Sequence, residues 1–240
     1  MVKMLQLKNI SFSASEGKAG ILSGVDLTFE TGKYYVITGP NGGGKTTLAK
    51  VIMGINTATD GKVLLDGTDV TDMSVTERAK LGISYAFQQP PRFKGITVQD
   101  LLNIAAGKKL DRAECCKYLT KVGLCATDYI GREVDASLSG GEMKRIEIAT
   151  VFAKQSKVMI FDEPEAGIDL WSFSKLTEAF REIHETTDAT LIIISHQERI
   201  ISQADEVVLL ASGKVTKRGT PSDVLGTILG YGGGCKYMEG

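Results

Sequence analysis

Residues 39–47 constrain the fold of this chain more than any other stretch. They have the spacing G-x-x-x-x-G-K-T, between an apolar run at 33–38 that predicts a buried strand and a helix predicted at 48–53. Glycines leave backbone N–H groups free to surround a polyphosphate, and the N-terminus of the helix adds partial positive charge. The alternative is a glycine-rich turn with an incidental lysine, and both flanks argue against it. The stretch therefore predicts a strand–loop–helix unit that binds a nucleoside triphosphate.

Two side chains of this loop have roles that follow from their chemistry. The ammonium group of Lys45 can reach the β- and γ-phosphates, and the hydroxyl of Thr46 can hold Mg²⁺. We therefore expect Lys45 to take part in both binding and catalysis. The other predicted members of the phosphate cradle are Gly39, Asn41, Gly42, Gly43, Gly44 and Thr47.

Residues 158–163 are an apolar run that ends in two acids. A buried strand that delivers carboxylates at its carboxyl end is how a nucleotide-binding sheet presents Mg²⁺ ligands beside its phosphate loop. We expect Asp162 to hold Mg²⁺ and Glu163 to orient and polarise the attacking water. The alternative is a strand that ends in a solvated acidic turn. The phosphate loop in the same chain favours the metal site.

Residues 138–142, Leu-Ser-Gly-Gly-Glu, directly precede a helix predicted to begin near Met143. Ser139, Gly140 and Gly141 at a helix N-terminus make a second anion site. The alternative is a simple N-cap with a flexible entry. One γ-phosphate needs only one such helix end, so we expect the second to serve the nucleotide of another subunit.

The rest of the chain alternates strand and helix patterns. Antiparallel hairpins are predicted for 2–12 with 21–29 and for 62–65 with 68–70, and further strands at 82–87, 158–161, 190–195 and 207–211. This pattern predicts an α/β fold: a mostly parallel nucleotide-binding core, covered on both faces, with an N-terminal antiparallel β subdomain. Residues 90–138 have helical periodicity and few strand signals. We divide the single domain, 1–240, into a catalytic core (1–89 and 155–240) and a helical subdomain (90–154).

Composition limits the partners and the location of the chain. Hydrophobic residues at 42% and charged residues at 24% are ordinary for a soluble globular protein. A net charge of −1 gives no electrostatic reason to expect nucleic acid as a partner. No apolar run reaches the roughly 18–20 residues that cross a bilayer, so we expect no direct membrane insertion. The N-terminal residues do not fit a signal peptide, and the expected location is cytoplasmic.

The cysteines do not predict a metal site. Cys115, Cys116, Cys125 and Cys235 fit no zinc template. The adjacent pair falls in a helical pattern, so we expect a structural role for it. A redox or sulfur-handling role is the alternative.

The order of these stretches resembles that of ABC-type ATPases. The phosphate loop, the LSGGE stretch, the acidic strand end and a histidine after residues 192–195 follow one another as in that family, over nearly the whole chain. The resemblance implies the ABC ATPase fold and hydrolysis of ATP to ADP and phosphate. It also implies an ATP-dependent homodimer packed head to tail. Each ATP would then lie between the phosphate loop of one subunit and Ser139 and Gly141 of the other.

Further site residues follow from the same resemblance. Gln88 matches the glutamine that senses Mg²⁺ and the partner protein, and we expect it to contact both nucleotide and metal. Asp169 belongs to a loop, 166–169, that resembles the one crossing the dimer interface. His196 resembles the switch histidine that contacts the γ-phosphate. A lone histidine after a strand is otherwise a packed or solvated residue, and its place in the motif order favours the functional role.

One departure from the family concerns the base. Transporter ATPases usually carry an aromatic residue in the first hairpin that stacks on adenine, where this chain has Ser13-Ala14-Ser15. Phe12 is the nearest aromatic residue, and its strand phase predicts that it packs in the core. Base recognition is therefore expected to be weak, and the choice between ATP and GTP stays open.

Several stretches are more similar to SufC, the ATPase of SUF iron–sulfur cluster assembly, than to transporter domains. They lie at 16–22, at 87–97, in the helix start at 139–145, and in the C-terminal third at 195–207 and 230–231. Pro164 is the contrary sign, because transporter domains usually carry that proline. The resemblance implies ATP-driven assembly of iron–sulfur clusters on a soluble SufB-like scaffold, docked in a groove near residues 88–93.

The alternative function is transport. The chain would then be the ATP-binding subunit of a membrane transporter, docked on a permease through the same groove. A free-standing ABC protein of DNA repair or translation is disfavoured, because it needs a long coiled-coil insertion or two fused cassettes. The sequence leaves open the cluster type, the transported substrate, the turnover rate, and the resting oligomeric state with its partner stoichiometry.

Overall fold

The computed structural model describes residues 4–14 and 20–231, with side chains up to residue 226. Predictions made for residues 16–19, for the side chains of 230–231 and for Cys235 lie outside the described residues. In that part of the chain, no helix is long and apolar enough to cross a bilayer.

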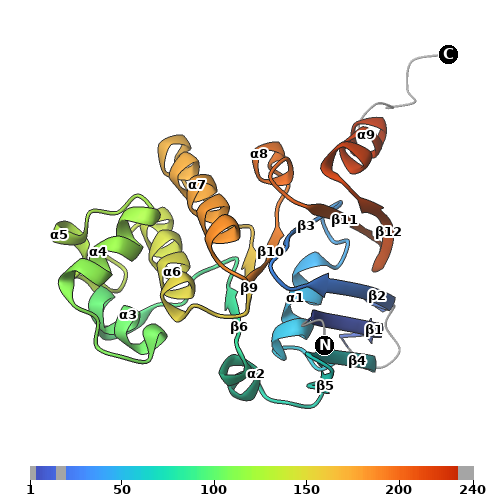
Figure 1. Ribbon diagram of the computed structural model, residues 1–240, viewed down its shortest axis with the longest axis horizontal. Coiled ribbons are helices and arrows are strands. Elements are labelled where there is room, and N and C mark those ends of the chain that lie inside the picture. Colours follow the sequence, from blue (N-terminus) through green and yellow to red (C-terminus); the bar gives the residue numbers. More distant parts are fainter. Residues whose placement is uncertain (1–3, 15–19, 232–240) are drawn as a thin grey trace.

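A six-stranded sheet runs through the centre of the molecule in the order β12-β11-β3-β10-β9-β6 (Figure 1). Its strands are β3 (Tyr34–Thr38), β6 (Ile83–Ala86), β9 (Val158–Asp162), β10 (Thr190–Ile194), β11 (Glu206–Ala211) and β12 (Lys214–Gly219). All neighbouring pairs are parallel except β11 with β12. The predicted α/β fold with a largely parallel sheet is confirmed.

A second, antiparallel sheet comes mainly from the N-terminal part of the chain. Its order is β2-β1-β4-β5, with β1 (Met4–Phe12), β2 (Leu22–Glu30), β4 (Asp60–Leu65) and β5 (Thr68–Asp69). Both predicted hairpins are present. Phe12 is half-buried and packs against the core beneath this sheet, as its strand phase predicts.

Neighbouring residues of the central strands serve opposite faces of the sheet. Tyr34 and Val36 of β3 belong to a core cluster shared with α6 (Gly140–Lys154) and α7 (Leu170–Thr186). Tyr35 and Ile37 belong to a second cluster, shared with α1 (Lys45–Met53) and the antiparallel sheet. Strands buried on both faces read as continuous apolar runs, which is why residues 33–38 and 158–161 are recognisable.

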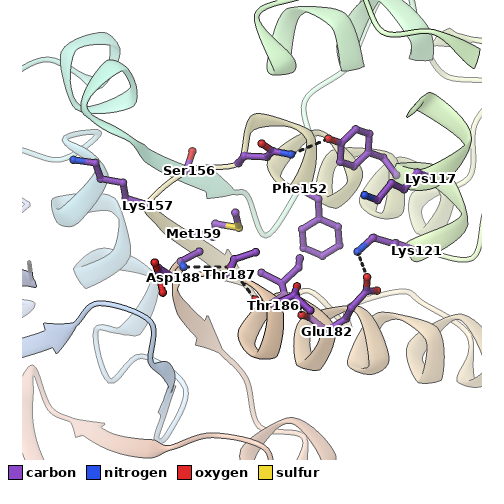
Figure 2. A pocket seen from close by; sticks show the side chains of 14 residues that line it. Lys117, Lys121, Phe152, Ser156, Lys157, Met159, Glu182, Thr186, Thr187 and Asp188 are labelled. Atoms are coloured by element: carbon purple, nitrogen blue, oxygen red, sulfur yellow. Dashed lines mark hydrogen bonds and ion pairs between the residues drawn. The ribbon is translucent and has the colours of Figure 1, made fainter. Parts of the chain in front are cut away.

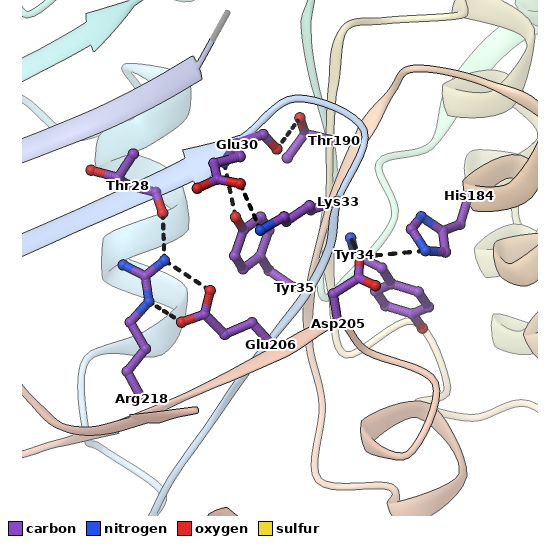
Figure 3. Close-up of polar contacts among 10 residues, drawn as sticks. All are labelled: Thr28, Glu30, Lys33, Tyr34, Tyr35, His184, Thr190, Asp205, Glu206 and Arg218. Atoms are coloured by element: carbon purple, nitrogen blue, oxygen red, sulfur yellow. Dashed lines mark hydrogen bonds and ion pairs between the residues drawn. The ribbon is translucent and has the colours of Figure 1, made fainter. Parts of the chain in front are cut away.

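Polar contacts near the start of β3 tie the two sheets together (Figure 3). Arg218 of β12 forms an ion pair with Glu206 of β11 and donates a 2.9 Å hydrogen bond to the carbonyl oxygen of Thr28 in β2. The hydroxyl of Thr190 donates to the carbonyl oxygen of Glu30 at 3.1 Å. These bonds fix the end of β2 against the parallel sheet.

The helical part contains strands that the sequence does not predict. Its helices are α3 (Val98–Ala106), α4 (Arg112–Lys121) and α5 (Ala126–Tyr129), the first two with the capping boxes of Thr97 and Asp111. Between β7 (Phe93–Thr97) and β8 (Glu133–Val134) runs an antiparallel pairing. The stretch 90–138 is mainly helical, as its periodicity predicts, and this short pairing is an addition to the helices. A pairing this short shows no alternating pattern in the sequence.

The remaining helices are α2 (Val75–Leu81), α8 (Glu198–Ile201) and α9 (Pro221–Tyr231). Helices α1 and α6 begin at Lys45 and Gly140, three residues before the starts predicted at 48 and 143. The first residues of α6 are glycines and those of α1 include two threonines, and the low helix propensity of both residue types hides these starts in the sequence. In α6, Ser139 and Glu142 form a capping box that offsets it. Cys115 packs in the core, and Cys116 and Cys125 are exposed thiols.

Candidate functional site

The phosphate loop runs from the end of β3 to α1 and lies close against β11. Gly39 has φ 139°, and a Cβ there would lie 2.0 Å from the carbonyl oxygen of Leu210, so no other residue fits without a backbone shift. The ammonium group of Lys45 donates to the carbonyl oxygens of Gly39 at 2.8 Å and Pro40 at 2.9 Å. Burial lowers the pKa of Lys45. The ammonium group of Lys45 therefore lies against the backbone of the predicted phosphate loop.

Thr46 and Asp162 meet at the carboxyl end of β9. The hydroxyl of Thr46 donates to Asp162 Oδ1 at 3.1 Å, and the hydroxyl of Tyr85 donates to Oδ2 at 2.7 Å. Asp162 is fully buried, and burial raises its pKa against the effect of these two hydrogen bonds. A buried carboxylate beside a hydroxyl is an oxygen donor set of the kind that Mg²⁺ takes. The residues fit that ion.

Glu163 follows directly, and its backbone turns sharply. Its N–H still donates to the carbonyl oxygen of Ile194 at 3.0 Å. Its φ of 47° then turns the chain out of β9 at the carboxyl end of the strand. The side-chain amide of Gln88 donates to Glu163 Oε2 at 2.7 Å. Gln88 comes from the end of β6, which pairs with β9. The predicted metal sensor and the predicted water-polarising residue are therefore in contact.

His196 lies just after β10, close enough to Lys45 and Glu163 for both charges to affect its pKa. Burial and the positive charge of Lys45 lower its pKa, and the negative charge of Glu163 opposes the shift. The imidazole is therefore largely neutral at neutral pH, a form that can donate or accept a hydrogen bond. Lys45, Thr46, Asp162, Glu163 and His196 thus gather at the carboxyl ends of β3, β9 and β10.

Glu165 is a neighbour of this site that the sequence does not reveal. The hydroxyl of Ser195, which is fully buried, donates to Glu165 Oε1 at 2.6 Å, and the N–H of Gln197 donates to the same hydroxyl at 3.0 Å. Burial raises the pKa of Glu165. The carboxyl group therefore holds the turn that contains His196. Glu165 and Ser195 are 30 residues apart in the chain, so no local sequence pattern predicts their contact.

The second predicted anion site lies with the helices. Figure 1 places the starts of α1 and α6 on different sides of β9. A Cβ on Gly141 would lie 2.6 Å from the carbonyl oxygen of Gly167, so the start of α6 packs on the 166–169 loop. Asp169 caps α7 by accepting from the N–H groups of Trp171 and Ser172. The starts of α6 and α7 thus form a second group of predicted site residues, apart from the one around Lys45: Ser139, Gly140, Gly141 and Asp169.

Two buried charges of α6 connect these groups. Lys144 is 1% exposed, and its ammonium group donates to the carbonyl oxygens of Asp162 at 3.0 Å and Gln88 at 3.4 Å, and to that of Phe87. Glu147 Oε1 accepts from the N–H of Phe87 at 2.8 Å. These residues hold the end of β6 and the end of β9 against α6. Most residues around them in α6 are apolar and buried. This apolar composition is the one sequence signal that the helix lies inside the fold.

A separate cavity of about 440 Å³ lies at the amino end of β9, away from the carboxylates (Figure 2). Phe152 and Met159 form part of its wall, and Lys121, at its edge, pairs with Glu182 at 2.6 Å. None of the predicted site residues lines it. It is therefore distinct from the candidate site.

Comparison with known proteins matches residues 22–166 to the family described as ABC transporter. The chain is 38% identical to an uncharacterized ABC transporter ATP-binding protein of Methanocaldococcus jannaschii, covering 93% of this chain and 92% of that one. It is 36% identical to the energy-coupling factor transporter ATP-binding protein EcfA1 of Mycoplasma mobile, covering 92% and 82%. Among solved structures, a dimeric ATP-binding cassette bound to ADP and Pi is similar, with a TM-score of 0.81, 21% identity, and coverage of 90% and 98%.

Proposed function

The chain belongs to the ABC transporter family and is an ABC-type ATPase, and from this premise we propose that it is the ATP-binding subunit of a membrane transporter. The observation that carries the proposal is the similarity over nearly the full length to proteins named as transporter ATP-binding subunits. It favours the transport alternative over assembly of iron–sulfur clusters. None of these relatives supports the resemblance to SufC, and Pro164 agrees with transport.

We propose that ATP binds with its phosphates in the loop at 39–47. Lys45 leaves the carbonyl oxygens of Gly39 and Pro40 and binds the β- and γ-phosphates, the strongest acceptors within its reach. Glu163 accepts a hydrogen bond from the attacking water and takes up its proton as the bond to phosphorus forms. His196, largely neutral, donates a hydrogen bond to the γ-phosphate. ADP and phosphate leave as products.

Mg²⁺ is proposed as the metal cofactor. Thr46, Asp162 and Gln88 would hold it, through oxygen atoms and directly or through water. The bound cation would neutralise charge on the phosphates. It would also oppose the effect of burial on the pKa of Asp162, because a carboxylate beside a cation is stabilised in its charged form.

Dimerisation completes the site in this proposal. The residues around Lys45 stabilise the γ-phosphate from one side only, and a second anion site lies apart on α6. Ser139 and Gly141 of a second copy would close the open face and exclude water. ATP would then act as a clamp between two copies, which hydrolysis releases. The permease is proposed to dock in the groove beside residues 88–93.

Isolation of the tagged chain from its native cells tests the transport proposal. The preparation is made with and without mild detergent, and the proteins recovered are identified. We expect a partner with several membrane-spanning segments that is recovered only with detergent. A soluble partner without such segments, together with iron and sulfide in the complex, would instead support the SufC resemblance.

A further inference from the structure

A cavity of about 180 Å³ lies where the segment after β6 crosses α6. Its wall includes Phe87, Pro90, Pro91 and Phe93, and its α6 side includes Met143 and Glu147. Small-molecule sites usually have volumes of roughly 300–1,000 Å³. This cavity is smaller, so it is suited to a single inserted side chain. Phe87, at 37% exposure, leaves its mouth partly open to solvent.

Glu147 is the one carboxylate among the described residues that line this cavity, and no lysine, arginine or histidine is among them. The residue is 9% exposed. One of its oxygens accepts the 2.8 Å hydrogen bond from Phe87, and the other is buried and accepts no hydrogen bond from any residue that the structure describes. Lys144 lies 3.9 Å from that second oxygen, too far for a hydrogen bond, and gives its own hydrogen bonds to carbonyl groups.

A buried carboxylate with a free acceptor is unfavourable unless a donor reaches it. Burial raises the pKa of Glu147 to about 7, which reflects this cost. A cation held by the carboxylate would offset the cost and would bring its own donors. Aromatic rings and prolines around the mouth suit the aliphatic stem and the flat charged head of an arginine.

We propose that the groove recognises its membrane partner through a basic side chain that inserts into the cavity lined by Phe87, Phe93 and Glu147 and pairs with Glu147. The inference rests on the proposed transport function and adds the recognition chemistry. It also supplies a route to the nucleotide. A cation at Glu147 acts on the Phe87 backbone, which Lys144 joins to the carbonyl group of Asp162.

The test uses Glu147→Gln, which keeps the shape of the side chain and an oxygen acceptor for Phe87. The tagged full-length chain and the variant are recovered from native membranes in mild detergent, and the affinity for the purified partner is measured. Glu178→Gln on α7 is the control, because Glu178 is exposed and, among the described residues, forms its ion pair with Lys175. We expect Glu147→Gln to weaken binding about tenfold to a hundredfold, the loss of one hydrogen bond to a charged group. The control should bind as wild type does.

Photo-crosslinking from position 150, on the cavity wall, identifies the partner segment. We expect this segment to contain an arginine or lysine. Exchange of that residue for glutamate should weaken binding, and combining this exchange with Glu147→Lys should restore it. Equal binding by Glu147→Gln and wild type, or a crosslinked segment without a basic residue, would overturn the inference and leave the transport function standing. Failure of the wild-type chain to recover any membrane partner would instead overturn the transport function, and this inference with it.

Discussion

The side-chain amide of Gln88 donates a 2.7 Å hydrogen bond to the carboxylate of Glu163. The contact joins the ends of β6 and β9, two paired strands, across the point where Thr46 and Asp162 also meet. Gln88 begins the segment proposed to face the partner, and Glu163 is the proposed water-polarising residue. A shift of that segment would therefore move a hydrogen bond on the proposed water-polarising residue.

Exchange of Glu163 for Gln should separate ATP binding from hydrolysis. The amide retains the size of the carboxylate but cannot take up the proton of the attacking water, so we expect kcat to fall about 10²- to 10⁴-fold. ATP should still bind and should hold two copies together, which sizing chromatography detects. Glu185→Gln, at an exposed position of α7, should retain wild-type turnover. A Glu163→Gln protein that stays monomeric with ATP would contradict the clamp mechanism.

Exchange of Lys45 for Ala should remove most of the affinity for the triphosphate. The variant loses the ammonium group that is proposed to move from Gly39 and Pro40 to the phosphates, and a charge-assisted contact of this kind is worth about tenfold or more. Titration calorimetry with ATP and Mg²⁺ measures the change. Lys50→Ala, on the same helix, is the control. Unchanged affinity in Lys45→Ala would refute the assignment of the phosphate loop.

Stability should depend on pH through Glu147. Burial raises its pKa from 4.5 to about 7, so the folded chain holds a proton there over a range in which the unfolded chain has released it. The contribution of Glu147 to the free energy of unfolding is therefore largest below about pH 4.5 and is lost as the pH rises through about 7, a change of about 3 kcal/mol at most. Glu147→Gln has no such proton. Urea denaturation at pH 5 and pH 8 should show the variant gaining stability relative to wild type at the higher pH.

Asp162 and Glu165 also have raised pKa values and titrate in both proteins. The difference between variant and wild type isolates Glu147 from them. A constant difference between pH 5 and pH 8 would mean that Glu147 keeps its ordinary pKa in the folded chain.

The predicted parts of the site are those that a local pattern encodes. The spacing of Lys45 and Thr46 in the phosphate loop, and the position of Asp162 at the end of an apolar run, are visible in a few residues. The meeting of Thr46 with Asp162 also follows, because parallel strands bring their carboxyl ends to one edge of a sheet. The order of elements then determines the fold class.

The unpredicted parts depend on pairs that are distant in the chain. The contacts of Lys144 with Phe87 and Asp162, and of Glu165 with Ser195, need the tertiary structure before the charges can be seen to have partners. The apolar residues around Lys144 indicate that α6 is buried, but a lysine in a helix is still expected to reach solvent. Its 1% exposure and its carbonyl partners result from packing of α6 on the sheet, and no local pattern predicts which groups it meets.

Exchange of Gly39 for Ala should destabilise the fold through a close approach of two chain segments. A Cβ at this position would lie 2.0 Å from the carbonyl oxygen of Leu210, so the phosphate loop and β11 must move apart. Gly67 supplies a matched control. It also has a positive φ, of 83°, but a Cβ at that position would have no atom within 4 Å. Both alanines are strained, by roughly 1–3 kcal/mol, because L-residues rarely adopt either positive φ.

Only Gly39→Ala adds the cost of overpacking, which is typically about 1–3 kcal/mol more. Urea denaturation of both variants at one pH measures the difference, and an equal m-value checks that the same surface unfolds. ATP affinity should fall in Gly39→Ala and stay unchanged in Gly67→Ala, because only the first displaces the N–H groups proposed to hold the phosphates. Equal losses of stability in the two variants would show that the backbone conformation, and not the contact with β11, requires glycine at position 39.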